Sequence, residues 1–308
     1  MRIGLMHGDA GTQTIEQHVA EAVQEEADGF DVSMWGQIFG ADSMTIIASA
    51  GLRTSRMEFV TAVIPTYTRH PFAMAQQAMT VRQATGGRFT LGIGPSHHLV
   101  VEGMWGMSYD KPAKHMREYL SVLLPLVTEG RVSFSGDLYR VNGGIAVKDG
   151  TPLPVMISAL APAMLKIAGS ITSGTITWMT GVRAIDSHVR PLLHAAAKEA
   201  GRPAPRIAVG LPICVTDDVA AAREAAGRAF AMYATLPNYR RILDREGETA
   251  SPADVAIVGN EGEAEARLRA LASAGATDFF GAVFPSGTDA AASIARTRAL
   301  LKSLVGRI

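Results

Sequence analysis

Cysteine is almost absent from this chain: Cys214 is the single one among 308 residues. One cysteine excludes an internal disulfide, and so low a count is typical of proteins from a reducing compartment. No apolar run approaches the roughly 18 residues that a membrane-spanning helix needs, and the apolar part of the N-terminal MRIGLMHGD is too short for a secretory signal. The sequence therefore predicts a cytoplasmic protein with no membrane partner.

An excess of one charge is missing as well, because 29 Lys and Arg balance 29 Asp and Glu. Proteins that bind nucleic acid usually carry a basic excess or a basic face, so we expect no nucleic-acid partner. Hydrophobic residues make up 47% of the chain, which is enough for a large core. The length suits one α/β barrel, which usually needs about 250 residues plus insertions.

Several catalytic motifs are also missing. The nearest approach to a dinucleotide fingerprint is Gly92-Ile93-Gly94, where His97 stands in place of the third glycine. P-loop and G-x-S-x-G patterns are absent, and the eight histidines form no H-E-x-x-H. We therefore expect no metal site, and we interpret Cys214, which lies in the apolar run LPICV, as a small buried hydrophobic residue.

The chain does contain a regular alternation of short apolar runs with segments of helical period. Such alternation predicts a parallel sheet covered by helices, and eight units favour a single (β/α)8 TIM barrel of the α/β class over residues 1–308. We expect a small hairpin insertion near 131–150 and extra helices near 234–258. The predicted strands are 2–6, 31–35, 57–63, 88–93, 155–158, 174–178, 207–215 and 278–284.

Two segments at predicted strand ends carry a family resemblance. The first is A-V-I-P-T-Y-T-R-H-P at 62–71, and the second is G-G-R-F-T-L-G-I-G-P-S-H at 86–97. They resemble the bacterial-luciferase-like superfamily, and within it the coenzyme F420-dependent branch. That branch includes methylenetetrahydromethanopterin reductase and F420-dependent glucose-6-phosphate dehydrogenase. The resemblance implies an oxidoreductase with a small-molecule substrate, and often a homodimer.

The resemblance also implies a cofactor site at the carboxyl ends of the strands. A bulge with a non-prolyl cis peptide would lie at Ala62-Val63, behind the deazaflavin ring. The loop with Gly94, Pro95, Ser96 and His97 would lie against the cofactor, and Ser158, Ala159 and Ala161 would flank its ring or its ribityl chain. Gln37 stands where relatives place a base or a cofactor contact. Thr180 and Gly181 would help to hold the phosphate of the cofactor, and Arg183 would either add charge there or face solvent.

The catalytic candidates are Gln37, His7 and His97. Gln37 stands where relatives that oxidise an alcohol place a histidine or an aspartate. Because glutamine cannot take up a proton at neutral pH, it can position a substrate but cannot act as a general base. This favours reduction of an activated double bond or an imine. His7 and His97 are candidate proton donors, and a structural role is an open alternative for each.

Two other functions remain open from the sequence. One is an FMN-dependent luciferase-like monooxygenase, and the other is a protein that binds a flavin or deazaflavin without catalysis. The loops at 103–114 and 234–248 would define the substrate. In the first of these loops, Met104, Trp105, Met107 and Tyr109 suggest either an apolar pocket wall or packing within the loop.

Overall fold

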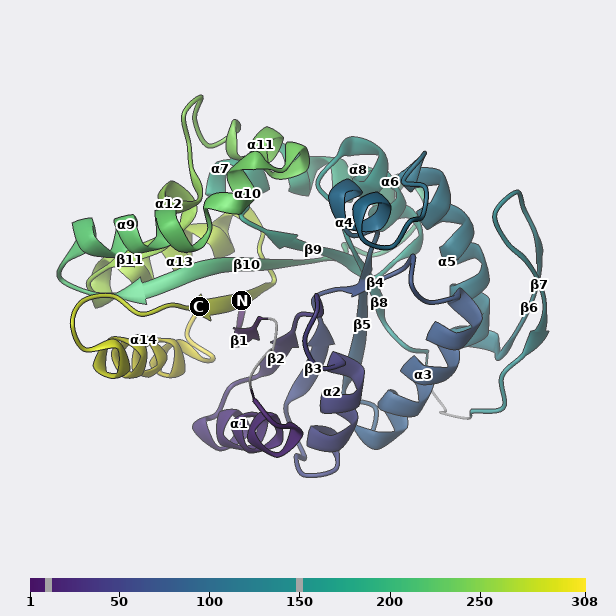
Figure 1. The fold of residues 1–308 in the computed structure, drawn as a ribbon, viewed down its shortest axis with the longest axis horizontal. Helices are drawn as coiled ribbons and strands as arrows, with labels where there is room; N and C mark the ends of the chain where they lie inside the picture. The colour runs from purple at the N-terminus through teal and green to yellow at the C-terminus, as the bar shows by residue number, and fades with distance from the viewer. Residues whose placement is uncertain (9–12, 148–151) are drawn as a thin grey trace. The chain divides into compact units, whose positions relative to one another are not determined.

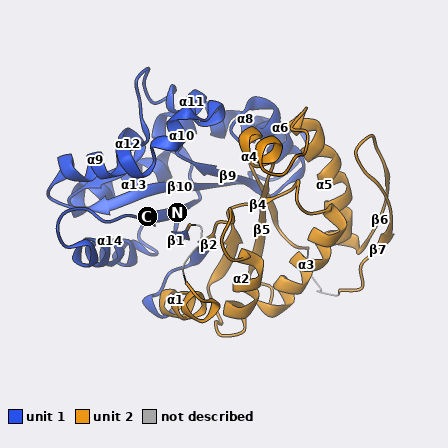
Figure 2. Cartoon of the chain, in the orientation of Figure 1, with its two compact units in different colours: residues 1–7, 27–34, 159–308 blue, residues 8–26, 35–158 orange. Residues whose placement is uncertain are grey.

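The computed structural model describes residues 1–8, 13–147 and 152–308, and it consists of two compact units (Figure 2). Unit 1 comprises residues 1–7, 27–34 and 159–308, and unit 2 comprises residues 8–26 and 35–158. Each unit contains parallel strands that alternate with helices along the chain.

The sheet of unit 1 is built on the long strand β10 (Arg206–Val215). β10 pairs in parallel with β9 (Gly174–Trp178) on one side and with β12 (Asp278–Val283) on the other, and β12 pairs in parallel with β1 (Arg2–His7). The short strand β11 (Ile257–Gly259) pairs with the last residues of β10. β2 (Val32–Trp35) is the next strand after β1.

Some helices of unit 1, which Figure 1 labels, begin at side-chain caps. The Asp218 side chain accepts a hydrogen bond from Ala221 N at the start of α9, and Asn260 and Glu263 form a capping box at the start of α13. The helices of this unit are α6 (Pro162–Ile171), α7 (Val182–Ala184), the π-helix η1 (Ile185–Val189), α8 (Arg190–Glu199), α9 (Val219–Ala229), α10 (Ala231–Thr235), α11 (Pro237–Leu243), α12 (Pro252–Val255), α13 (Glu261–Ala274) and α14 (Ala290–Leu304).

In unit 2, the parallel strands are arranged around β5. β5 (Phe89–Gly94) pairs with β3 (Glu58–Thr61), with the two-residue strand β4 (Ile64–Pro65) and with β8 (Val155–Ser158). The helices are α1 (Ile15–Asp28, whose last two residues belong to unit 1), α2 (Ser43–Gly51), α3 (Pro71–Ala84), α4 (His98–Gly103) and α5 (Pro112–Glu129). β6 (Arg131–Ser135) and β7 (Arg140–Gly144) form an antiparallel hairpin after α5.

These elements confirm most of the sequence-based predictions. All eight predicted strands are present in the described residues, but the third ends at Thr61, before the cis peptide, and a further two-residue strand, β4, follows it. The predicted hairpin is β6–β7, although residues 148–150 of that prediction lie outside the described residues. The extra helices are α10, α11 and α12. β11 and α4 were not predicted, because three and six residues are too few to show a period.

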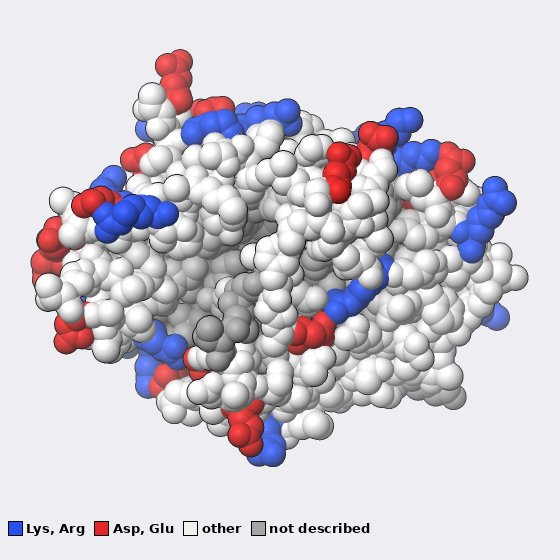
Figure 3. Space-filling model, in the orientation of Figure 1, with Lys and Arg blue, Asp and Glu red and all other residues white. Residues whose placement is uncertain are grey.

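The surface carries both charges. On the face that Figure 3 views, Lys and Arg side chains stand next to Asp and Glu side chains among the described residues. Among the helices of the described residues, none has both the length and the apolar composition to cross a membrane.

Candidate cofactor site

The ends of three strands in unit 2 meet at Gly94. The peptide bond between Ala62 and Val63 is cis, as the family resemblance implied, and Ala62 N donates to Trp35 O over 2.8 Å. A Cβ atom on Gly94 would lie 2.3 Å from Ser158 Oγ and 2.7 Å from Val63 Cγ2. Three residues predicted to bind the cofactor therefore touch one another, and glycine is needed at position 94 because any side chain would overlap its neighbours.

The Y-T-R-H-P motif holds the loop after β4 in place. The Arg69 guanidinium forms an ion pair with Asp42, and Asp42 also caps α2 by accepting from Thr45 N over 2.8 Å. The ring of His70 accepts a hydrogen bond from Phe72 N at the start of α3, and Pro71 is the first residue of that helix. The motif is thus a structural element that fixes the strand end.

An aromatic cluster that the sequence did not predict supports the same loop. The rings of Tyr67 and His115 are stacked, with centroids 4.0 Å apart and planes within 5° of parallel. His115 Nε2 lies 2.9 Å from Thr66 Oγ1, and Thr66 N donates to Gly94 O over 2.9 Å. Burial lowers the pKa of His115 to about 4. This buried, neutral imidazole therefore connects α5 to the strand end at Gly94.

Gln37 lies in the loop after β2 with its side-chain oxygen already hydrogen-bonded. Oε1 accepts from Ser43 N over 3.2 Å and from Ser43 Oγ over 3.1 Å. Because an amide has one oxygen and one NH2 group, Gln37 can offer the NH2 group as a donor to a ligand.

The loop after β5 carries the other candidates of unit 2. Ser96 adopts a left-handed conformation with φ of 60°, and its carbonyl accepts from Tyr109 Oη over 3.1 Å. Pro95 is partly buried, and so is His97, which stands at the N-cap position of α4. Burial lowers the pKa of His97, so its ring is mainly neutral at neutral pH.

In unit 1, two candidates lie in the short segment that follows β8. Ala159 N donates to Thr175 Oγ1 over 3.2 Å, and Ala161 is the N-cap residue of α6. Between them, Leu160 O lies 2.8 Å from Nε2 of His188, a buried residue of η1. π-helical turns occur often at functional sites, although no sequence pattern predicted this one.

The turn after β9 differs from the prediction in one respect. Thr180 is buried, and its hydroxyl donates to Trp178 O over 3.1 Å. The carboxylate of Glu246 accepts from Ala184 N over 2.7 Å and from Arg183 N over 3.3 Å. A Cβ atom on Gly181 would lie 2.7 Å from the carboxyl carbon of Glu246. The Glu246 carboxylate therefore accepts hydrogen bonds from the backbone N–H groups to which a phosphate at this turn would bind.

Arg183 also contacts Glu246 through its side chain. Its side chain is exposed, as one of the two predicted alternatives had it, but Nη1 donates to the backbone carbonyl of Glu246 over 3.1 Å. The phosphate-binding roles of Thr180, Gly181 and Arg183 remain predictions, and an anion does not fit this arrangement unless Glu246 moves.

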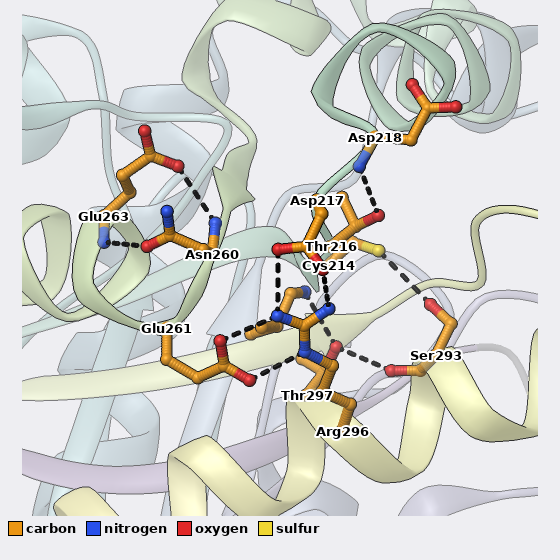
Figure 4. A network of polar contacts seen from close by, with 11 residues as sticks. Cys214, Thr216, Asp217, Asp218, Asn260, Glu261, Glu263, Ser293, Arg296 and Thr297 are labelled. Carbon is orange, nitrogen blue, oxygen red and sulfur yellow. Dashed lines mark hydrogen bonds and ion pairs between the residues drawn. The ribbon is translucent and has the colours of Figure 1, made fainter.

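Two further residues considered from the sequence are His7 and Cys214. His7 is the last residue of β1 in unit 1 and is partly buried. Cys214 is fully buried, which confirms its interpretation as a hydrophobic residue, and burial raises the pKa of its thiol. Its Sγ lies 3.4 Å from Ser293 Oγ in the network of Figure 4. Among the described residues, no three His, Cys, Asp or Glu side chains are grouped as a metal site requires.

The two parts of the predicted site differ in what lies beside their glycines. On the ring side, in unit 2, Val63 and Ser158 pack beside Gly94. On the phosphate side, in unit 1, Glu246 stands in the way.

Comparison with known proteins shows the family. The family model for luciferase-like monooxygenases matches residues 1–301. A Mycobacterium tuberculosis protein that is provisionally named a coenzyme F420-dependent oxidoreductase is 30% identical over 239 residues, 72% of this chain and 69% of that protein. The 5,10-methylenetetrahydromethanopterin reductase of Methanolobus tindarius is 24% identical over 77% of this chain and 73% of that protein.

A solved structure shows the fold. The coenzyme F420-dependent tetrahydromethanopterin reductase of Methanopyrus kandleri superposes with a TM-score of 0.81, at 20% identity, over 99% of this chain and 98% of that chain. The likeness confirms the predicted (β/α)8 barrel.

Proposed function

Because this chain belongs to the luciferase-like monooxygenase family, we propose that it is an oxidoreductase that uses coenzyme F420. In this proposal it reduces an activated carbon–carbon double bond or an imine in a small organic substrate. When bound, reduced F420 supplies a hydride, since a carbon replaces the flavin nitrogen that supports one-electron and oxygen chemistry.

The residues of unit 2 supply the positioning. In this proposal the ring lies against the strand ends at which Val63 and Ser158 pack beside Gly94. His115 and Tyr67 keep the loop after β4 in one conformation through the Thr66 contact to Gly94. A rigid support of this kind matters because hydride transfer requires donor and acceptor carbons within about 3–3.5 Å.

The direction of the reaction is inferred from one observation: the side-chain oxygen of Gln37 already accepts hydrogen bonds from Ser43. Oxidation of an alcohol needs a base for the hydroxyl proton, and a glutamine in this place cannot supply one. Its NH2 group can instead donate to a carbonyl or nitro oxygen and polarise the double bond next to it. A proton must also be delivered, and His97 and His7 are the candidates for that step.

Parallel fluorescence titrations of the purified protein with F420 and with FMN test the cofactor. We expect micromolar or tighter binding of F420 and much weaker binding of FMN. A preference for FMN would replace this proposal with the oxygen-dependent chemistry of a monooxygenase. Binding of F420 without turnover of any unsaturated substrate would indicate a protein that binds the cofactor without catalysis.

Gln37→Glu tests the direction. Glutamate keeps an oxygen that Ser43 can contact but loses the NH2 group and adds a charge. We expect the rate of enone reduction to fall by about 10- to 100-fold, since one hydrogen bond to an oxygen that gains charge is worth about 2.7–4 kcal/mol at most. The affinity for F420 should stay within about threefold. Ser43→Ala is the control, because it removes the hydroxyl contact to Oε1 but keeps the backbone N–H contact and the amide. An unchanged rate in Gln37→Glu would remove Gln37 from the reaction.

A further inference from the structure

The segment Ala159–Ala161 has its backbone held at successive residues by side chains of other elements. Ala159 N donates to Thr175 Oγ1 over 3.2 Å, and the Thr175 hydroxyl in turn donates to Ala159 O over 3.2 Å. Leu160 O lies 2.8 Å from His188 Nε2. Since Thr175 belongs to β9 and His188 to η1, two separate elements of unit 1 fix this short segment before α6.

The contact between Leu160 and His188 determines where the ring carries a hydrogen. A carbonyl oxygen can only accept a hydrogen bond, so Nε2 of His188 must be the donor. The His188 side chain is buried, with 6% of its surface exposed. A buried donor that lost its acceptor would be costly, so the bond ties the imidazole and the Leu160 carbonyl to each other.

Holding two successive carbonyls sets the direction of the two N–H groups that follow them. In a trans peptide, the C=O and N–H bonds point in opposite directions. Because Ala159 O is held by Thr175, the N–H of Leu160 points away from Thr175. Because Leu160 O is held by His188, the N–H of Ala161 points away from His188. Within the described residues, neither N–H group has an acceptor.

The N–H groups without an acceptor continue into the first turn of α6. Ala161 is the N-cap residue and offers no side-chain cap, and Pro162 has no N–H. The N–H groups of Ala163 and Met164 also lack an acceptor in the part of the chain that the structure describes. Ala161, Pro162 and Ala163 are exposed, so a ligand can approach this backbone without meeting a large side chain.

His188 stands on an element that is packed directly against α6. A Cβ atom on Gly169 of α6 would lie 2.3 Å from Leu193 O and 2.9 Å from Ala196 Cβ of α8. The backbones of the two helices are therefore in close contact, and η1 continues directly into α8. The distance from His188 to Leu160 is thus set by helix packing.

We propose that His188 is a positioning residue for coenzyme F420. Through Leu160 O it holds the segment Ala159–Ala161 in the conformation in which the N–H groups of Leu160 and Ala161 are available to the cofactor. This role rests on the proposed function, because F420 must be the ligand. It adds to the site a residue of η1 that acts through the backbone of Leu160.

Three substitutions separate the hydrogen bond of His188 from its volume. Glutamine places an NH2 group where Nε2 lies, asparagine carries its NH2 group one bond closer to the backbone, and leucine has no donor. We expect His188→Gln to bind F420 within about threefold of the wild type. His188→Asn and His188→Leu should bind it about five- to tenfold more weakly, the effect of losing one hydrogen bond. Fluorescence titration of the full-length proteins measures the affinity.

Val189→Ala is the matched control for stability. Val189 is the fully buried neighbour of His188 in η1, and removing its two methyl groups leaves the bond to Leu160 in place. We expect this variant to have a lower melting temperature, because a core side chain is truncated, and the F420 affinity of the wild type.

A second readout needs no cofactor. In spectra of 15N-alanine-labelled protein without F420, the amide signals of Ala161 and Ala163 should move further from their wild-type positions in His188→Leu than in His188→Gln. Both variants lack the imidazole ring, so the difference between them reports the hydrogen bond to Leu160.

Equal F420 affinities of His188→Gln and His188→Leu, or equal alanine shifts in the two, overturn the proposal. A loss of affinity in Val189→Ala as large as in His188→Leu also overturns it, because stability alone would then explain both. If the wild type binds F420 and His188→Leu binds it as tightly, the proposed function stands and the positioning role fails. If the wild type binds no F420, the proposed function fails, and the role of His188 towards this cofactor fails with it.

Discussion

In unit 2, Val63 and Ser158 from neighbouring strand ends fill the space beside Gly94, whereas in unit 1 the Glu246 carboxylate fills the space beside Gly181. Both places were predicted from the same kind of signal, a small residue after a strand. The first depends on neighbours in adjacent strands, which a parallel sheet always brings together. The second depends on a side chain more than 60 residues further along the chain. Small residues thus indicate where a neighbour packs closely against the backbone, but not which side chain that neighbour is.

The largest expected effect is at Gly94. Gly94→Ala places a Cβ 2.3 Å from Ser158 Oγ and 2.7 Å from Val63 Cγ2, so the strand ends must move apart. Such overpacking typically costs about 1–3 kcal/mol, and we expect F420 affinity to fall by at least about tenfold. Fluorescence titration measures the affinity, and circular dichroism establishes that the variant is folded.

Gly227→Ala is the control for that substitution, since the nearest atom to a new Cβ there is 3.9 Å away, in ordinary contact. An alanine inside helix α9 should be neutral or slightly stabilising. Unchanged F420 binding by folded Gly94→Ala would show that the ring does not approach the backbone at this position.

A change in the opposite direction is expected at Glu246. Glu246→Ala frees the N–H groups of Arg183 and Ala184, and hydrogen bonds to a charged group are worth about 1.5–3 kcal/mol. If the cofactor phosphate binds there, F420 should bind about tenfold more tightly than to the wild type, and the phosphate-free deazaflavin chromophore should bind as before.

Glu248→Ala removes the same charge from an exposed neighbour and is the control. Equal tightening for both ligands would show a general opening of the turn, and no tightening for either would place the phosphate elsewhere. Either result would correct the role that family resemblance gives to Thr180 and Gly181.

The fold was predictable because its signals are local and repeated. The runs at 155–158 and 174–178 coincide with β8 and β9, and Pro71 begins α3 as expected for a proline in a first turn. The cis bond at Ala62-Val63 came from family resemblance and is present. The contacts of Gln37 with Ser43, of His115 with Tyr67 and of Glu246 with α7 were not predictable, since each depends on side-chain directions set by packing between elements.

The aromatic support of the strand end should make stability depend on pH. The pKa of His115 is lowered by burial from 6.5 to about 4, so the unfolded chain binds a proton on this ring more readily than the folded chain does. The stabilisation is therefore complete above pH 6.5 and is lost as the pH falls towards 4. We expect the melting temperature to fall across this window, and less steeply in His115→Phe, which keeps a ring against Tyr67. Parallel melting curves of the two proteins between pH 7 and 4 measure the difference, and identical slopes would contradict this assignment.

The smallest effect is expected in the charged network of unit 1. The Arg296 guanidinium donates to both oxygens of Asp217, at 2.9 and 3.2 Å, and to both oxygens of Glu261, at 2.7 and 2.8 Å (Figure 4). The hydrogen bonds from Arg296 lower the pKa of Glu261 to about 2. These groups tie α14 to the loop after β10 and to the start of α13, but they are largely solvated, and ion pairs in water contribute little.

Arg296→Met should therefore lower the melting temperature only slightly, and the difference from the wild type should shrink as salt is added, because salt screens exposed pairs. Lowering the pH from 4.5 towards 2 should also remove the difference, since Glu261 then takes up a proton. F420 affinity should be unchanged, in contrast to Gly94→Ala. A loss of cofactor binding in Arg296→Met as large as in Gly94→Ala would mean that the end of β10 takes part in the site, and that the ring side cannot be assigned to unit 2 alone.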